Sequence, residues 1–69
     1  MPLSLAVIGE ENIIKRIGGS AEVRAHLQNL GFVPGAAVTV VSSMAGNLIV
    51  NVKNVRIAIS REMASKIII

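Results

Sequence analysis

The chain contains no cysteine, tryptophan, tyrosine or aspartate, and it has only one phenylalanine and one histidine. Without cysteine it has no disulfide framework and no thiolate for a metal ion. Without cysteine or aspartate, its serines and single histidine do not make a positioned catalytic triad. A chain of 69 residues is also too short to enclose a substrate in a deep cleft. We therefore expect no enzyme and no bound cofactor.

Charge is missing from the middle of the chain, where no charged residue lies between Arg24 and Lys53. That interval exceeds the ~20 apolar residues that a transmembrane helix needs. The N-terminus lacks the charged start and the cleavage site of a signal peptide. The uncharged interval also contains polar and turn-forming residues that would leave polar groups unpaired in lipid, namely His26, Gln28, Asn29, Gly31, Pro34, Gly35, Ser42, Ser43, Gly46, Asn47 and Asn51. We therefore expect a soluble, cytoplasmic protein.

Aliphatic residues are abundant, and the chain is 52% hydrophobic. Ten isoleucines, nine valines and one threonine are β-branched, which favours strands. The chain shows no internal repeat and no low-complexity linker, and its length allows one domain. The composition predicts a single, mainly β domain over residues 1–69.

One helix is predicted after the first strand. Ser20 is a typical N-cap residue, and Val23, Leu27 and Leu30 form a narrow apolar stripe at helical spacing. Gly31 ends the helix, because glycine adopts a left-handed conformation at little cost. Phe32 is then placed to fold back over Leu27. In the next residues, Pro34 and Gly35 occupy the positions that a type II turn favours.

Alternating aliphatic residues predict five strands, over residues 12–17, 37–43, 48–53, 55–59 and 66–69, with a turn at 44–46. A two-residue loop at Lys53 and Asn54 would pair Val52 with Val55 and put the apolar residues of both strands on one face. The same register pairs Val50 with Ile57 and Leu48 with Ile59. Ser60 caps a short helical turn over 61–65. This order predicts a small SH3-like β-barrel whose last strand pairs with an earlier one.

Acidic side chains offer two pairs for general acid–base chemistry, Glu10 with Glu11 and Glu22 with Glu62. Adjacent glutamates on a loop or strand point apart, and we interpret them as solvated residues. His26 lies at the edge of the helical stripe, with Glu22 one turn earlier. A two-ligand surface site of this kind would be weak and unselective. We expect His26 to be half-buried beside Leu30, and we predict no tight metal site.

The C-terminal third carries the whole net charge of +3, and a basic surface is one indication of nucleic-acid binding. Stacking surfaces for bases need aromatic residues on a strand face, and the only aromatic residue is Phe32 at the end of the helix. We expect no nucleic-acid binding. A small nucleic-acid-binding barrel remains the third and weakest hypothesis.

The segment over residues 27–35, L-Q-N-L-G-F-V-P-G, resembles the helix end of the FeoA family of ferrous iron transport proteins. The rest of the chain resembles the family in order, over residues 3–10, 38–40, 46–50, 56–59 and 64–67. Three features depart from it: Ile8 stands where a proline is frequent, Lys53 and Asn54 replace a glycine-containing turn, and the loop around Met44 is short. These differences concern the loops more than the fold.

The resemblance implies an SH3-like accessory protein of ferrous iron uptake that contacts FeoB, a membrane permease with a GTP-binding domain. Contact with the membrane would then be made only through this partner, and any transition metal would come by family association. The alternative is a regulatory SH3-like module, akin to the C-terminal domain of DtxR-type metal-dependent repressors. No DNA-binding helices precede the domain here, which favours the transport protein.

The outward helix face combines small side chains with one cation, which suits a protein interface. With the resemblance added, we predict that this face and the following elbow (residues 30–35) bind the partner through Ala21, Arg24, Ala25, Gln28, Leu30, Gly31, Pro34 and Gly35. An ordinary exposed helix face is the alternative interpretation. If the last strand left an open edge, Ile68 or Ile69 would offer a second surface for weak homo-oligomerisation.

Overall fold

The computed structural model describes all residues, 1–69, as six short strands, two α-helices and one 3-10 helix. In chain order these are η1 (Leu3–Leu5), β1 (Glu11–Ile13), β2 (Arg16–Ile17), α1 (Ala21–Asn29), β3 (Ala37–Met44), β4 (Asn47–Val52), β5 (Val55–Ser60), α2 (Arg61–Ala64) and β6 (Ile67–Ile68). The predicted mainly β, SH3-like architecture is confirmed. Neither α-helix has the length and apolar content required to span a bilayer.

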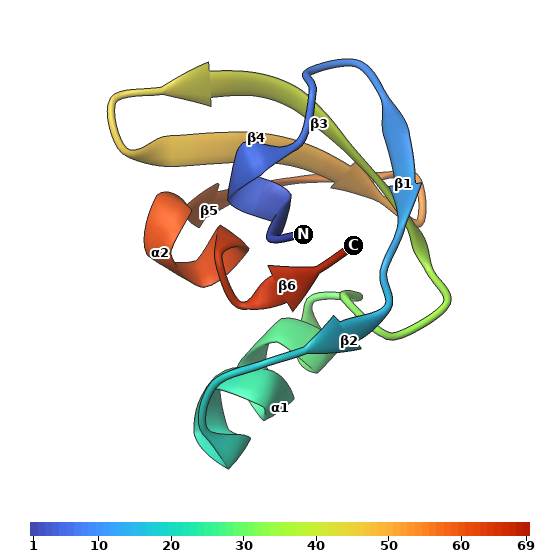
Figure 1. Ribbon diagram of the computed structural model, residues 1–69, viewed down its shortest axis with the longest axis vertical. Helices are drawn as coiled ribbons and strands as arrows, with labels where there is room; N and C mark the ends of the chain where they lie inside the picture. Colours follow the sequence, from blue (N-terminus) through green and yellow to red (C-terminus); the bar gives the residue numbers. More distant parts are fainter.

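The strands form two sheets. Four of them follow the order β1-β3-β4-β5, and β2 pairs with β6 in a separate antiparallel ribbon. The barrel is therefore not closed by a continuous ladder. Figure 1 shows β6 and both chain ends lying between the larger sheet and α1, with α1 beyond the ribbon at the lower end of the molecule.

The first predicted strand, over residues 12–17, is wrong as one element, because the structure divides it into β1 and β2. Ile14 bonds through its N–H to Ala36 O at 2.9 Å, while Lys15 N–H donates to Ile68 O at 2.7 Å. The chain thus changes its pairing partner between these two residues. This switch accounts for six strands instead of the predicted five.

The β4–β5 hairpin has the predicted register, with Val52 opposite Val55, Val50 opposite Ile57 and Leu48 opposite Ile59. Both loop residues have positive φ, 51° at Lys53 and 63° at Asn54, as a type I′ turn requires. Val55 differs from the predicted inward set because it is 54% exposed at the end of the hairpin.

Other boundaries shift by one or two residues. β3 continues through Met44, so the predicted turn at 44–46 begins one residue later, and β6 is shorter than the predicted 66–69. Ser60 caps α2 by accepting a hydrogen bond from Met63 N–H at 3.1 Å, as predicted. Between Val40 and Ser42 the β3–β4 register shifts, so Val41 forms a bulge that the alternating pattern does not reveal.

One hydrophobic core joins all parts of the fold, and no polar side chain is buried in it. Its members come from η1, both sheets, both α-helices and the elbow: Leu3, Ile14, Ile17, Leu27, Phe32, Val38, Val40, Leu48, Val50, Val52, Ile59, Ala64, Ile67 and Ile69. Because Leu27 and Phe32 belong to it, α1 and the elbow are fixed to the sheets by packing.

Candidate partner-binding surface

Helix α1 begins as its sequence predicts. Ser20 has extended backbone angles, and its Oγ accepts a hydrogen bond from Val23 N–H at 3.2 Å. Glu22 lies in the first turn, where the positive end of the helix dipole favours a carboxylate. Toward the core, Leu27 is fully buried, and Val23 and Leu30 are partly buried. The predicted apolar stripe is thus the inward face of α1.

The opposite face of α1 is exposed along its whole length. Ala21, Arg24, Ala25 and Gln28 follow the spacing i, i+3, i+4 and i+7, and each is exposed. The Arg24 guanidinium takes part in none of the side-chain hydrogen bonds of the structure. This face therefore presents one free cation among short side chains.

The C-terminal end of α1 is fixed by two backbone hydrogen bonds. Phe32 N–H donates to Leu27 O, and Gly31 N–H donates to Gln28 O, both at 3.0 Å. These are the two bonds of a Schellman motif. Gly31 has a φ of 107°, a backbone conformation that favours glycine. The predicted helix end and the return of Phe32 to the core are confirmed.

The elbow continues as the predicted type II turn. Ala36 N–H donates to Val33 O at 3.1 Å, and Gly35 has a φ of 90°. Gly35 N–H also donates to Ile14 O at 2.8 Å, and this bond ties the elbow to the break between β1 and β2. Pro34 and Gly35 are exposed, while Leu30 and Gly31 are partly buried. Six of the eight predicted surface residues are thus exposed.

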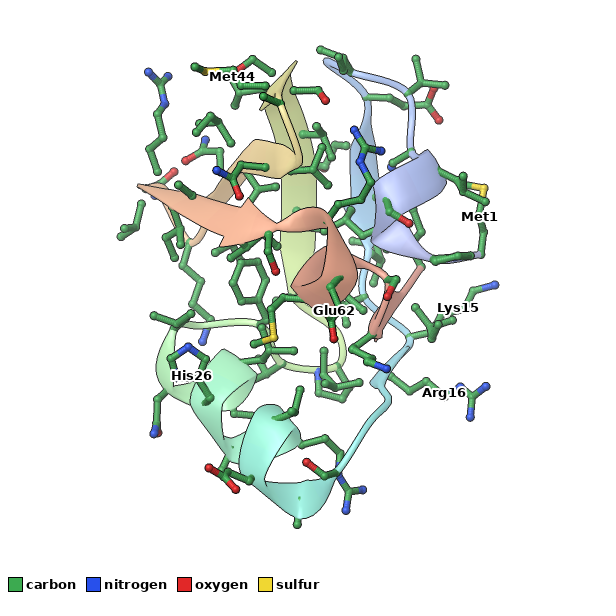
Figure 2. The ribbon with its side chains drawn as sticks, turned by 90° about the vertical axis from the view of Figure 1, so that its left-hand side faces the viewer. Met1, Lys15, Arg16, His26, Met44 and Glu62 are labelled. Carbon is green, nitrogen blue, oxygen red and sulfur yellow. The ribbon has the colours of Figure 1, made fainter.

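His26 is not half-buried as predicted. It is exposed, and Figure 2 shows its ring projecting sideways from α1. Helical spacing explains the difference, because His26 lies about 60° from the centre of the buried stripe at 100° per residue. Glu22 is one turn away and also exposed. Nowhere in the structure do three His or Glu side chains gather into a set suited to a metal ion.

The other glutamates are dispersed over the surface. Glu10 precedes β1 and Glu11 lies within it, while Glu22 and Glu62 belong to different helices. All four are exposed. These side chains are therefore solvated, as expected from the sequence.

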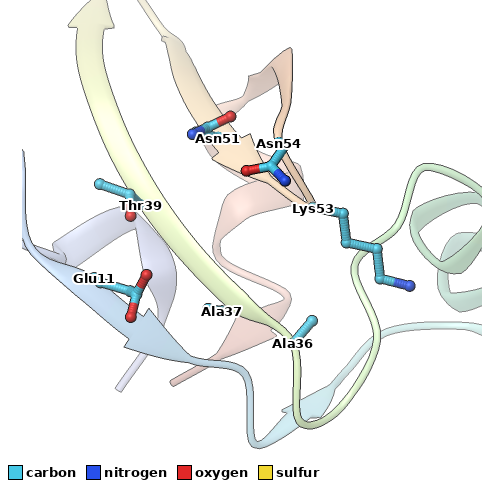
Figure 3. Close-up of a pocket in the computed structure, with 7 residues that line it drawn as sticks. All are labelled: Glu11, Ala36, Ala37, Thr39, Asn51, Lys53 and Asn54. Carbon is cyan, nitrogen blue, oxygen red and sulfur yellow. The ribbon is translucent and has the colours of Figure 1, made fainter.

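A shallow pocket of about 250 Å³ lies on the outer face of the large sheet and was not predicted. Cross-strand pairing places Glu11 opposite Thr39 and Thr39 opposite Asn51, so one row of polar side chains crosses three strands. The short side chains of Ala36 and Ala37 lie between those of Glu11 and Lys53 in the view of Figure 3. The lining comprises Glu11, Ala36, Ala37, Thr39, Asn51, Lys53 and Asn54. Only the register of β1 against β3 could have indicated it, and that register spans distant segments.

The last strand has neighbours on both sides. Ile67 and Ile68 pair with Ile17 and Arg16 of β2, and Ile68 forms a bridge with Pro2 on its other side. Ile69 O accepts a hydrogen bond from the N-terminal ammonium group at 2.9 Å. The predicted pairing of the last strand with an earlier one is confirmed. The open edge that strand addition at Ile68 or Ile69 required is therefore absent.

These features define a small SH3-like domain with a helix at one end that is capped at both ends and exposes its outward face. The family model for the FeoA domain matches residues 1–69, and the chain belongs to the FeoA family. A relative from Methanocaldococcus jannaschii, whose name describes it as an Fe(2+) transport protein A, is 34% identical over 68 residues. That alignment covers 99% of this chain and 83% of the relative.

Solved structures agree with this assignment. A crystal structure of the iron uptake regulatory protein FeoA superposes with a TM-score of 0.89 at 32% identity, covering 97% of this chain and 91% of the other. FeoA of Stenotrophomonas maltophilia, a prokaryotic SH3 domain protein crystallised with zinc, gives a TM-score of 0.86 at 23% identity over 99% and 87% of the two chains. The second likeness concerns the fold alone.

A similar fold forms part of a larger protein. A manganese-dependent transcriptional repressor superposes with a TM-score of 0.88 at 16% identity, and the match covers 97% of this chain but 39% of the repressor. The predicted likeness to a repressor domain is confirmed at the level of the fold. As a FeoA family member, the protein is a small accessory protein of ferrous iron transport.

Proposed function

We propose that the protein acts in the cytoplasm as a non-enzymatic partner of a FeoB-type membrane permease, binding it through α1 and the elbow and altering its transport or GTPase activity. Membership of the FeoA family supports a role in ferrous iron uptake. The observation that carries the docking surface is the uninterrupted exposed face of α1, where the Arg24 guanidinium takes part in none of the side-chain hydrogen bonds.

Two physical features suit this face to a protein partner. Small side chains at Ala21 and Ala25 let another backbone approach closely, and arginine is a frequent anchor of interfaces. The face is also held in place before binding, because a side-chain cap fixes one end of α1 and the Schellman bonds fix the other. A preorganised surface loses little conformational freedom on association.

The test is the binding of the protein to full-length FeoB in lipid nanodiscs, with Arg24→Glu as the variant. We expect association to weaken about tenfold, which corresponds to ~1.4 kcal/mol. The melting temperature should stay unchanged, because substitutions of exposed residues alter stability by only about ±0.5 kcal/mol. Arg16→Glu is the matched control, since Arg16 is also exposed but belongs to β2, and its side chain extends on the opposite side of the view from His26 of α1 (Figure 2). Equal weakening by both variants, or by neither, would refute α1 as the docking surface.

A regulatory module that recognises a repressor or a peptide is the second candidate function, supported by the likeness to the manganese-dependent repressor. That likeness concerns the fold alone. The two functions differ in genomic context, since an accessory of transport is expected beside a gene for a GTP-binding membrane permease. Binding to the repressor in place of the permease would favour the second candidate.

A further inference from the structure

β5 is an edge strand of the four-stranded sheet, and no strand pairs with its outer edge. β5 lies last in the strand order and has six residues, whereas β1, at the opposite edge, has three. In Figure 1 β5 runs behind β4 and leads into α2. Unpaired strand edges of this length are templates for another strand.

The hairpin register shows which backbone groups face outward. A type I′ turn bonds its first residue to its fourth, here Val52 to Val55, and hydrogen-bonded pairs then alternate along an antiparallel ladder. Val55, Ile57 and Ile59 therefore bond to β4, and the N–H and C=O groups of Arg56 and Ala58 point away from it. Neither of these two residues takes part in any backbone hydrogen bond outside the ladders.

β5 lacks most of the features that protect an edge strand. It contains no proline, no glycine, no bulge and no inward-pointing charge. On its inner face Val55 is 54% exposed and Ile57 is partly buried, so apolar surface continues to the edge. On its outer face Arg56 is the one charged residue. An added strand would cover apolar side chains and satisfy backbone groups at the same time.

The charges around β5 indicate the chemistry of the strand that would pair with its outer edge. No acidic residue lies between Glu22 and Glu62, so the only charges from β3 through β5 are Lys53 and Arg56. Lys53 belongs to the loop that leads into β5, and Figure 3 shows its side chain extending from that loop toward the elbow. A second copy of this chain would bring like charges to the edge, which destabilises cross-strand pairs. An acidic strand is complementary.

We propose that the outer edge of β5 binds an extended, acidic segment of another protein as an added antiparallel strand. Backbone groups of Arg56 and Ala58 bond to the segment, a carboxylate lies opposite the Arg56 side chain, and apolar residues of the segment cover Val55 and Ile57. This site is separate from the outward face of α1, so the proposal does not rest on the docking surface assigned above.

The experiment uses the whole chain, labelled with ¹⁵N, and an eight-residue peptide of alternating glutamate and valine. We expect chemical-shift changes centred on Val55–Ser60 and slower hydrogen exchange at the Arg56 and Ala58 amides. Arg56→Glu should weaken binding at least fivefold, and Arg16→Glu less than twofold. Ala58→Pro removes an outward N–H that the hairpin does not use, and it should abolish binding while the chain stays folded. If Ala58→Pro does not fold, the effect of Arg56→Glu on binding tests the proposal instead.

Four other outcomes would overturn the proposal. These are no binding, shift changes centred on α1 or the sheet pocket, equal binding of a peptide with lysine in place of glutamate, and equal weakening by Arg16→Glu. Protection of the Arg56 amide together with dimer formation in sedimentation, without peptide, would assign the edge to a second copy. Tighter binding of an oligonucleotide at the same residues would assign it to nucleic acid.

Discussion

The side chain of Lys53 lies over Gly31, with its Cδ 3.8 Å from the point where a Cβ on Gly31 would stand. A Val52 Cγ1 atom lies at the same distance. The β4–β5 turn thus covers the end of α1, and two segments far apart in the sequence meet at one corner. Because 3.8 Å is an ordinary contact distance, space alone would admit a methyl group at Gly31. The effect of a substitution at Gly31 therefore depends on its backbone conformation.

Gly31→Ala is expected to lower the free energy of unfolding by about 1–2 kcal/mol, since an L-residue at a φ of 107° is strained. Gly31→Asn should cost less, because asparagine tolerates positive φ better. Urea unfolding of both variants checks this order. Lys53→Ala in the Gly31→Ala background is the control for crowding: recovery of stability there would show that steric contact, and not backbone strain, causes the loss.

A second prediction concerns metal binding at His26. The ring is exposed, Glu22 is its only neighbouring carboxylate along the helix, and no third ligand joins them. We expect calorimetric titration of the isolated domain with Fe²⁺ under anaerobic conditions, or with Zn²⁺, to show no stoichiometric binding at micromolar concentrations. His26→Ala and Glu22→Gln should give the same titration curve as the unaltered protein. Tight binding that disappears in His26→Ala would establish a metal site on α1.

Elements with local signals could be predicted from the sequence. Ser20, Gly31 and the Pro34–Gly35 turn specify both ends of α1 and the elbow through hydrogen bonds within a few residues. The β4–β5 register follows from alternation and a two-residue loop. These features need no knowledge of the rest of the chain.

Most features that depend on distant partners could not be predicted, although the pairing of the last strand with an earlier one was. Ile14 bonds to Gly35 of the elbow, whereas the next residue, Lys15, bonds to Ile68 of β6. Nothing in the sequence near Ile14 indicates this change of partner, because both partners lie far along the chain. The same holds for the burial of Leu3 in η1 and for the pocket across β1, β3 and β4. For the candidate surface, helical spacing identified the exposed face of α1, but the prediction that His26, at the edge of the apolar stripe, is half-buried was wrong.

The third prediction concerns the N-cap of α1, which holds the first turn of the candidate surface. The Ser20 Oγ satisfies the Val23 N–H at 3.2 Å, and α1 has only nine residues, so fraying would reach Ala21 and Arg24. Ser20→Ala should cost about 1 kcal/mol of stability, while Ser20→Asp should retain it because aspartate is an equally good cap. Hydrogen exchange at the Arg24 and Ala25 amides should accelerate in Ser20→Ala and not in Ser20→Asp. If the two variants exchange alike, or if Ser60→Ala in α2 accelerates the same amides equally, the cap does not hold this end of α1.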